Sequence, residues 1–136
     1  MSEQKDSVAI RLSRDAVLGI NKFKTLLFGT EDVPVSSGYI VTKAFQEIFK
    51  DYQRIDWFRI NSKSTNIPGI TDDNSAVTGI DTRLSLDQSV HEDMKLLQKF
   101  LIENVYEGRV YFSFVVTSIL KAAIIRRTSD INEYYH

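Results

Sequence analysis

Residues 82–101, TRLSLDQSVHEDMKLLQKFL, change their hydrophobic periodicity part-way along. Thr82, Leu84 and Leu86 alternate with more polar neighbours, and this period of two predicts a half-buried strand. From residue 90 onward, apolar residues recur at spacings of four, three and four, which predicts one face of a helix. The residues of that face are Val90, Met94, Leu97 and Leu101. The stretch therefore predicts a strand followed directly by a helix.

The same pattern occurs earlier, in residues 7–27. Val8, Ile10 and Leu12 alternate with Ser7, Ala9 and Arg11, and Ser13 is placed to cap a following helix. The apolar face of that helix consists of Ala16, Ile20, Phe23 and Leu27. The similar strings RLSRD at 11–15 and RLSLD at 83–87 give an offset of 72, which breaks the helical face. An offset of 74 keeps strand and helix aligned without a gap, so we take 74 as the repeat register.

A second helix is predicted in each copy. Ser36 is a good N-cap, and Ile40, Ala44 and Ile48 form the apolar face of the helix that follows it. In the other copy, residues 110–125 form an apolar helix, which aligns with the first at an offset of 75. The chain is therefore predicted to contain two copies of a strand-helix-helix unit.

One strand alone would leave its backbone groups unpaired, so the two units are expected to pair their strands antiparallel. The predicted fold is mainly α with a two-stranded antiparallel ribbon, formed by two units as an intramolecular pseudo-dimer. The first unit with its C-terminal extension spans 7–60, and the second spans 79–127. Residues 61–78 are a loop or linker, because 61–75 (NSKSTNIPGITDDNS) are almost all turn-forming and are expected to be mobile. Residues 128–136 form a polar tail.

Composition excludes several classes of protein. The 136 residues include no cysteine, which rules out disulfides and thiolate metal sites. The net charge of −1 argues against a surface that is positive all over. His91 and His136 lack metal-ligand spacing, and we interpret both as surface residues. No nucleophile-base arrangement or signal segment is evident. We therefore expect a cytoplasmic protein that is not an enzyme, with no cofactor, metal, small-molecule substrate or membrane partner.

The two copies resemble the ribbon-helix-helix DNA-binding fold in a tandem version, over roughly 7–49 and 79–125. Residues 82–101 resemble its strand and first helix, and residues 33–48 (VPVSSGYIVTKAFQEI) resemble its second helix. The resemblance implies that the ribbon enters the major groove of DNA, where outward side chains contact base edges. The matching positions are Ser7, Ala9, Arg11, Asp81, Arg83 and Ser85.

The resemblance also implies that phosphates bind at the starts of the second helices. Ser36, Ser37 and Gly38 match this position in the first copy. In the second copy Tyr111 and Phe112 replace the serines, and only Ser113 is retained. The two halves are therefore expected to engage DNA unequally, with the first copy holding phosphate better.

The expected function is sequence-specific binding of double-stranded DNA, with further self-association on DNA. A transcription regulator of a virus, plasmid or other mobile element, in a prokaryotic or virus-infected host cell, is the preferred role. Two alternatives stay open. One is an accessory DNA-binding protein of the conjugative relaxosome, and the other is a degenerate ribbon-helix-helix module for protein interaction. The acidic pI, Ala9, Asp81 and the helix start at Tyr111 and Phe112 motivate the last of these.

Overall fold

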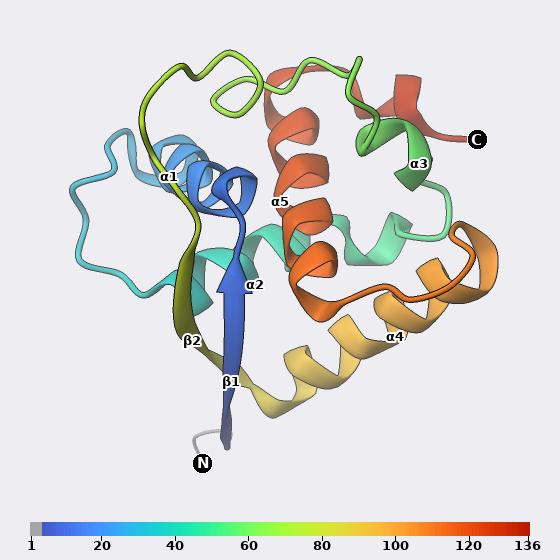
Figure 1. Ribbon diagram of the computed structural model, residues 1–136, viewed down its shortest axis with the longest axis horizontal. Helices are drawn as coiled ribbons and strands as arrows, with labels where there is room; N and C mark the ends of the chain where they lie inside the picture. Colours follow the sequence, from blue (N-terminus) through green and yellow to red (C-terminus); the bar gives the residue numbers. More distant parts are fainter. Residues whose placement is uncertain (1–3) are drawn as a thin grey trace.

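The computed structural model describes residues 4–136 and is mainly helical, with one two-stranded antiparallel sheet (Figure 1). This confirms the predicted fold class at that level. The sheet consists of β1 (Lys5–Leu12) and β2 (Ile80–Asp87). The long helices are α1 (Arg14–Phe28) and α2 (Ser37–Ile48) after β1, and α4 (Gln88–Asn104) and α5 (Phe112–Thr128) after β2. The short elements are the 3-10 turn Phe49–Asp51, α3 (Trp57–Ile60) and the 3-10 turn Ile131–Tyr134.

One face of the ribbon packs on the core. Leu12, Leu84 and Leu86 are buried, and Val8 and Ile10 are partly buried against the same cluster. The alternation in the sequence therefore marked the correct inward face. Helices lie against this face, and no helix within residues 4–136 covers the opposite face (Figure 1).

Strand β1 begins at Lys5, two residues before the predicted start. Asp6 takes an inward position in the register opposite Leu86, and its Oδ2 lies 2.8 Å from Nδ1 of His91 on α4. The His91 side chain is only 13% exposed, so its interpretation as a surface residue is wrong. The polar partner explains how a carboxylate occupies this side of the ribbon.

The predicted helix caps of the first copy are confirmed. The hydroxyl of Ser13 accepts a hydrogen bond from Ala16 N at 3.2 Å, and that of Ser36 accepts one from Tyr39 N at 3.1 Å. Gly29 ends α1 with a φ of 80°, a left-handed conformation that glycine adopts without strain. Asp87 precedes α4 but makes no side-chain cap, because its carboxylate pairs with Lys5 instead.

Helix α5 runs through the middle of the molecule and is surrounded by α1, α2 and α4 (Figure 1). It is buried along most of its length between Val115 and Ile125. Gly19 lets α1 approach closely, because a Cβ at that position would lie 3.0 Å from Cβ of Leu120. A helix that is apolar on all sides fits only such a central position.

The segment between the two halves packs on the core. Residues 61–79 contain no helix or strand, but Ile67 and Ile70 are buried. The Arg14 guanidinium donates to the backbone oxygens of Asp73 and Ser75, each at 3.1 Å. The prediction of a mobile loop did not take account of these two isoleucines, whose burial in the core holds the turn-forming residues around them in place.

The C-terminal residues pack on the stretch just before α3. Ile55 and Tyr135 form an isolated antiparallel bridge, and Asp56 N donates to the Tyr134 oxygen at 2.6 Å. The Arg54 guanidinium lies 4.4 Å from the centre of the Tyr135 ring. The polar tail is thus bound to residues 54–56. Between residues 4 and 136, no helix is long and apolar enough to cross a membrane.

Candidate nucleic-acid interface

The outward face of the ribbon brings together all six residues predicted to read bases. These residues are exposed, and they come from alternate positions of β1 and β2: Ser7, Ala9, Arg11, Asp81, Arg83 and Ser85. Alternate residues of a strand project from the same face, so this grouping follows directly from the two-residue period.

The strand register sets which of these residues lie side by side. Ser7 is opposite Ser85, Ala9 is opposite Arg83, and Arg11 is opposite Asp81. Ala9 is small and leaves the guanidinium of Arg83 free to extend over β1. There Arg83 donates to the hydroxyl of Ser7 at 2.8 Å and to its backbone oxygen at 3.1 Å. Arg83 therefore crosses the middle of the outward face.

Charges on this face are arranged as cross-strand pairs. Arg11 Nη1 lies 3.5 Å from an oxygen of Asp81, whose side chain is 85% exposed. Lys5 and Asp87 pair at 2.8 Å at the other end of the ribbon. Lys5 and Asp87 were missed from the sequence, although the alternation that selected Ser7 and Ser85 continues to both. The face has three basic and two acidic side chains, the third base being Arg83.

The start of α2 lies against the middle of β2. A Cβ at Gly38 would lie 2.2 Å from the backbone oxygen of Ser85, so glycine is required for this close contact. Gly38 is buried, whereas Ser36 is exposed and Ser37 is half-buried. Of the three predicted phosphate residues, the two serines are thus accessible, and Gly38 positions the helix.

A hollow of about 360 Å³ adjoins the start of α2. It is lined by Ser36, Lys43 and Ser85, and by the paired Lys5 and Asp87 at the end of the ribbon. Two lysines and a helix N-terminus beside the outward face suit an anion such as a phosphate. Lys43, on the second turn of α2, was not singled out from the sequence.

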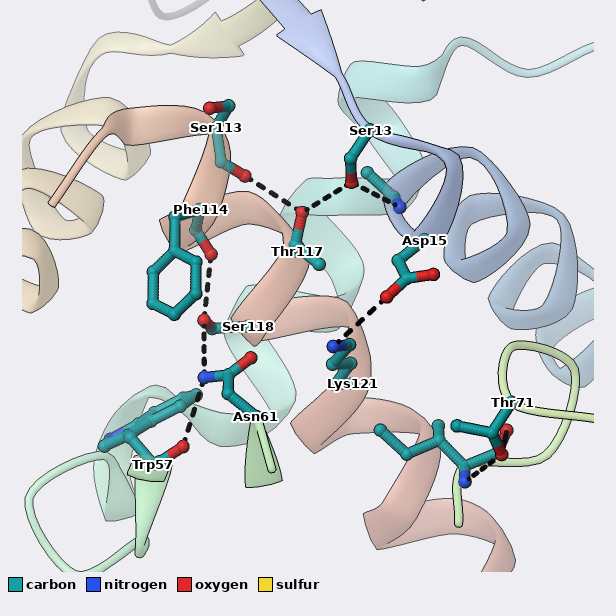
Figure 2. Close-up of polar contacts among 12 residues, drawn as sticks. Ser13, Asp15, Trp57, Asn61, Thr71, Ser113, Phe114, Thr117, Ser118 and Lys121 are labelled. Atoms are coloured by element: carbon teal, nitrogen blue, oxygen red, sulfur yellow. Dashed lines mark hydrogen bonds and ion pairs between the residues drawn. The ribbon is translucent and has the colours of Figure 1, made fainter. Parts of the chain in front are cut away.

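The start of α5 differs from that of α2. Tyr111 precedes it without a side-chain cap and is exposed, and Ser113 is half-buried. The backbone oxygen of Ser113 accepts a hydrogen bond from the Thr117 hydroxyl at 3.0 Å (Figure 2). A second hollow lies here, lined by Ser113, Thr117 and Lys121 among others. The structure thus shows unequal helix starts in the two halves.

Aromatic rings pack against one another near this helix. The Tyr106 ring contacts those of Phe58 and Phe114, with ring centres 6.1 and 5.3 Å apart. Burial raises the pKa of the Tyr106 hydroxyl above 10.0, partly offset by a hydrogen bond from Asn61. Tyr106 and Phe114 pack against the core, whereas Phe58 is mostly exposed.

No cluster of three or more histidine, cysteine or acidic side chains able to hold a metal occurs within residues 4–136. Comparison with known proteins gives no match to any family model, curated protein or solved structure.

Proposed function

We propose that the chain binds double-stranded DNA as a tandem ribbon-helix-helix protein, with the outward face of β1 and β2 in the major groove. The observation that carries the proposal is a ribbon with one face on the helical core and the other bare and polar. Two strands lie about 5 Å apart, and the major groove is about 12 Å wide, so the ribbon fits.

The pseudo-dimer is part of this proposal. Its first support is the element order, a strand followed by two long helices, which occurs twice. Its second support is matched burial at the offset of 74. Leu12 and Leu86 are both buried, as are Phe23 and Leu97. A pseudo-twofold axis with this offset passes between Ala9 and Arg83, which are paired in the ribbon. One chain would thus supply both halves of a DNA-binding unit.

Arg83 is the main base-reading residue in this mechanism. In the proposed complex this residue, at the centre of the ribbon, faces the floor of the groove, where arginine binds guanine O6 and N7 with two hydrogen bonds. Its bonds to Ser7 hold it in place in the free protein. On DNA these bonds are exchanged for bonds to guanine. Ser7 and Ser85 add short polar contacts on either side.

Phosphate contacts come from the start of α2. Ser36 and Ser37 are accessible there, and Lys43 and Lys5 border the same hollow. The start of α5 has no side-chain cap and presents Tyr111, so its phosphate contact is weaker. The resulting asymmetry suits recognition of a DNA site whose two halves differ.

The test is fluorescence anisotropy with duplexes selected from a random pool. Arg83→Ala should weaken binding about 5- to 150-fold, the range for losing one bidentate contact to guanine. Lys99→Ala is the matched control, because Lys99 is 71% exposed on α4 and its replacement also removes one positive charge. Affinity of the wild type should fall as salt rises, through release of counterions.

The DNA proposal is abandoned if the wild type binds no duplex at low salt. It also fails if Lys99→Ala weakens binding as much as Arg83→Ala, because the loss would then reflect net charge and not a contact made by the ribbon.

A protein-interaction module is the second candidate. The pairs Arg11–Asp81 and Lys5–Asp87 favour it, because they offset four of the five charges on the outward face. A protein surface with alternating charges would match such a face, whereas uniformly anionic DNA must compete with both aspartates. Absence of duplex binding, with the fold intact by circular dichroism, would favour this candidate.

We further propose that two or more molecules assemble on one DNA site, since one ribbon covers only a few base pairs. Sedimentation of complexes on selected duplexes should show more than one protein per duplex. Binding sites located at promoters would support the role of regulator, and sites at a transfer origin would support a relaxosome accessory role.

A further inference from the structure

The hollow beside α5 lies at the start of that helix, where Ser113 lines it, and has a volume of about 300 Å³. Ser13 and Asp15 border it at the start of α1, Thr117 and Lys121 line it from α5, and Asn61 comes from the connecting segment (Figure 2). Four separate parts of the fold therefore meet at one hollow, because Tyr111 lines it from the loop before α5.

Asn61 has a fixed orientation in this site. Its Nδ2 donates to the Trp57 oxygen at 3.1 Å and to Ser118 Oγ at 3.0 Å. The Trp57 oxygen can only accept, and the Ser118 hydroxyl donates its own hydrogen to the Phe114 oxygen at 2.8 Å. The amide nitrogen must therefore face these groups, and the amide cannot be reversed.

That orientation leaves Asn61 Oδ1 buried without a hydrogen-bond partner. It is the one such side-chain atom found among residues 4–136. Figure 2 shows it turned away from Ser118, toward the side of α5 that carries Lys121. A buried acceptor left unpaired costs free energy, and this oxygen has almost no accessible surface, so a bound molecule reaches it only after the side chains around it shift.

Two opposite charges face the same space. Lys121 Nζ lies 3.3 Å from an oxygen of Asp15, and their side chains are 13% and 42% exposed. An ammonium has three donors, and one carboxylate does not use them all. A ligand with one charge would be repelled by one member of this pair. A ligand with both charges can bind both members.

We propose that this hollow binds a small zwitterion, namely an α-amino acid with an apolar side chain. Its ammonium pairs with Asp15 on the side of the hollow lined by Asn61, and its carboxylate accepts from Lys121. The rings of Tyr111 and Phe114 also line the hollow and pack against the apolar side chain. The volume lies at the lower end of small-molecule sites, which fits a ligand of this size. The proposal does not depend on DNA binding.

The probe is L-phenylalanine, followed by ¹⁵N NMR on the whole chain. The amide signals of Asn61, Ser113 and Lys121 should shift and saturate, with a dissociation constant of about 1 mM or below. Phenethylamine lacks the carboxylate and 3-phenylpropionate lacks the ammonium. Each should bind at least about tenfold more weakly, because each leaves one charge of the site unpaired.

Variants assign the site. Lys121→Met should weaken L-phenylalanine binding about tenfold or more, while Lys43→Met, in the hollow beside α2, should leave it unchanged. The two analogues test the wild type directly, so the proposal can fail even if Lys121→Met does not fold. It is overturned if L-phenylalanine gives no saturating shift, if the shifts lie elsewhere, or if both analogues bind as well as the amino acid.

Discussion

Replacing Gly38 by alanine tests the fold, because steric contact and helix propensity predict opposite changes in the free energy of unfolding. Gly38 occupies the second residue of α2 and has no positive φ, so alanine is conformationally acceptable there. On propensity alone, Gly38→Ala should stabilise the protein by about 0.5–1 kcal/mol. The added Cβ, however, would lie 2.2 Å from the Ser85 oxygen and 3.0 Å from the Ser85 carbonyl carbon.

The clash must be relieved by moving backbone. Ser85 lies within β2 and is paired with Ser7, so neither the carbonyl nor the helix start can shift alone. An ordinary contact requires about 1 Å more separation, and overpacking of this kind costs about 1–3 kcal/mol. Taking the upper part of that range because the neighbour is backbone, we expect a net loss of about 2 kcal/mol after the gain in propensity.

Urea denaturation monitored by circular dichroism measures this difference. Gly38→Ala should lower the free energy of unfolding by about 2 kcal/mol, whereas Ser37→Ala, one residue earlier, should change it by less than about 0.5 kcal/mol. If Gly38→Ala is as stable as the wild type or more stable, α2 does not approach β2 as described. The account of how the start of α2 is positioned beside the ribbon would then be refuted.

Other substitutions test separate features. Asp81→Asn should strengthen duplex binding about 2- to 5-fold by releasing Arg11 and removing a repulsive charge, and an unchanged affinity in the anisotropy assay would contradict this. Glu47→Gln should lower the free energy of unfolding, measured in urea, by about 1 kcal/mol. Arg127 is partly exposed and binds both carboxylate oxygens of Glu47, at 2.9 and 2.6 Å. An unaltered midpoint of urea unfolding would show that water replaces this ion pair. The raised pKa of Tyr106 means that the folded state favours the neutral hydroxyl. The stability that this neutral hydroxyl contributes is present below pH 10.0 and is lost as pH rises through the pKa of the folded state. Tyr106→Phe should therefore lose less stability than the wild type between neutral pH and the alkaline range, and parallel thermal-unfolding curves would count against this.

The periodic parts of the sequence predicted most of the fold. Alternation in Val8, Ile10 and Leu12 identified both the strand and its inward face, so the outward residues followed without further information. The caps Ser13 and Ser36 were also predictable, because their side chains act within one helical turn. These features depend on local spacing, which a single sequence contains.

Features that depend on distant partners were not predictable. Asp6 enters β1 because His91, far along the chain, supplies a polar contact for its carboxylate. Ile67 and Ile70 lie among turn-forming residues, and their burial depends on surfaces from other parts of the chain. The same limit applies at the hollow beside α5, where Asn61 is one asparagine in a polar segment until the fold places its amide against α5.

Within the candidate interface, sequence reasoning found the positions but not the pairings. It placed Arg11 and Asp81 on the same face from the period of two, whereas their ion pair requires the antiparallel register. Lys43 was missed because its importance comes from the hollow it shares with Lys5. Charge pairing and hollows thus arise from tertiary structure.

The most direct test of the central claim uses the absence of native cysteine. A single cysteine at the centre of the outward face, Ala9→Cys, is offered a selected duplex with a thiol tethered to a base in the major groove. The account predicts a disulfide between protein and DNA, and none with Lys99→Cys, whose side chain is exposed on α4. If Ala9→Cys binds the duplex with full affinity and forms no disulfide at any tethered position, the ribbon does not lie in the groove.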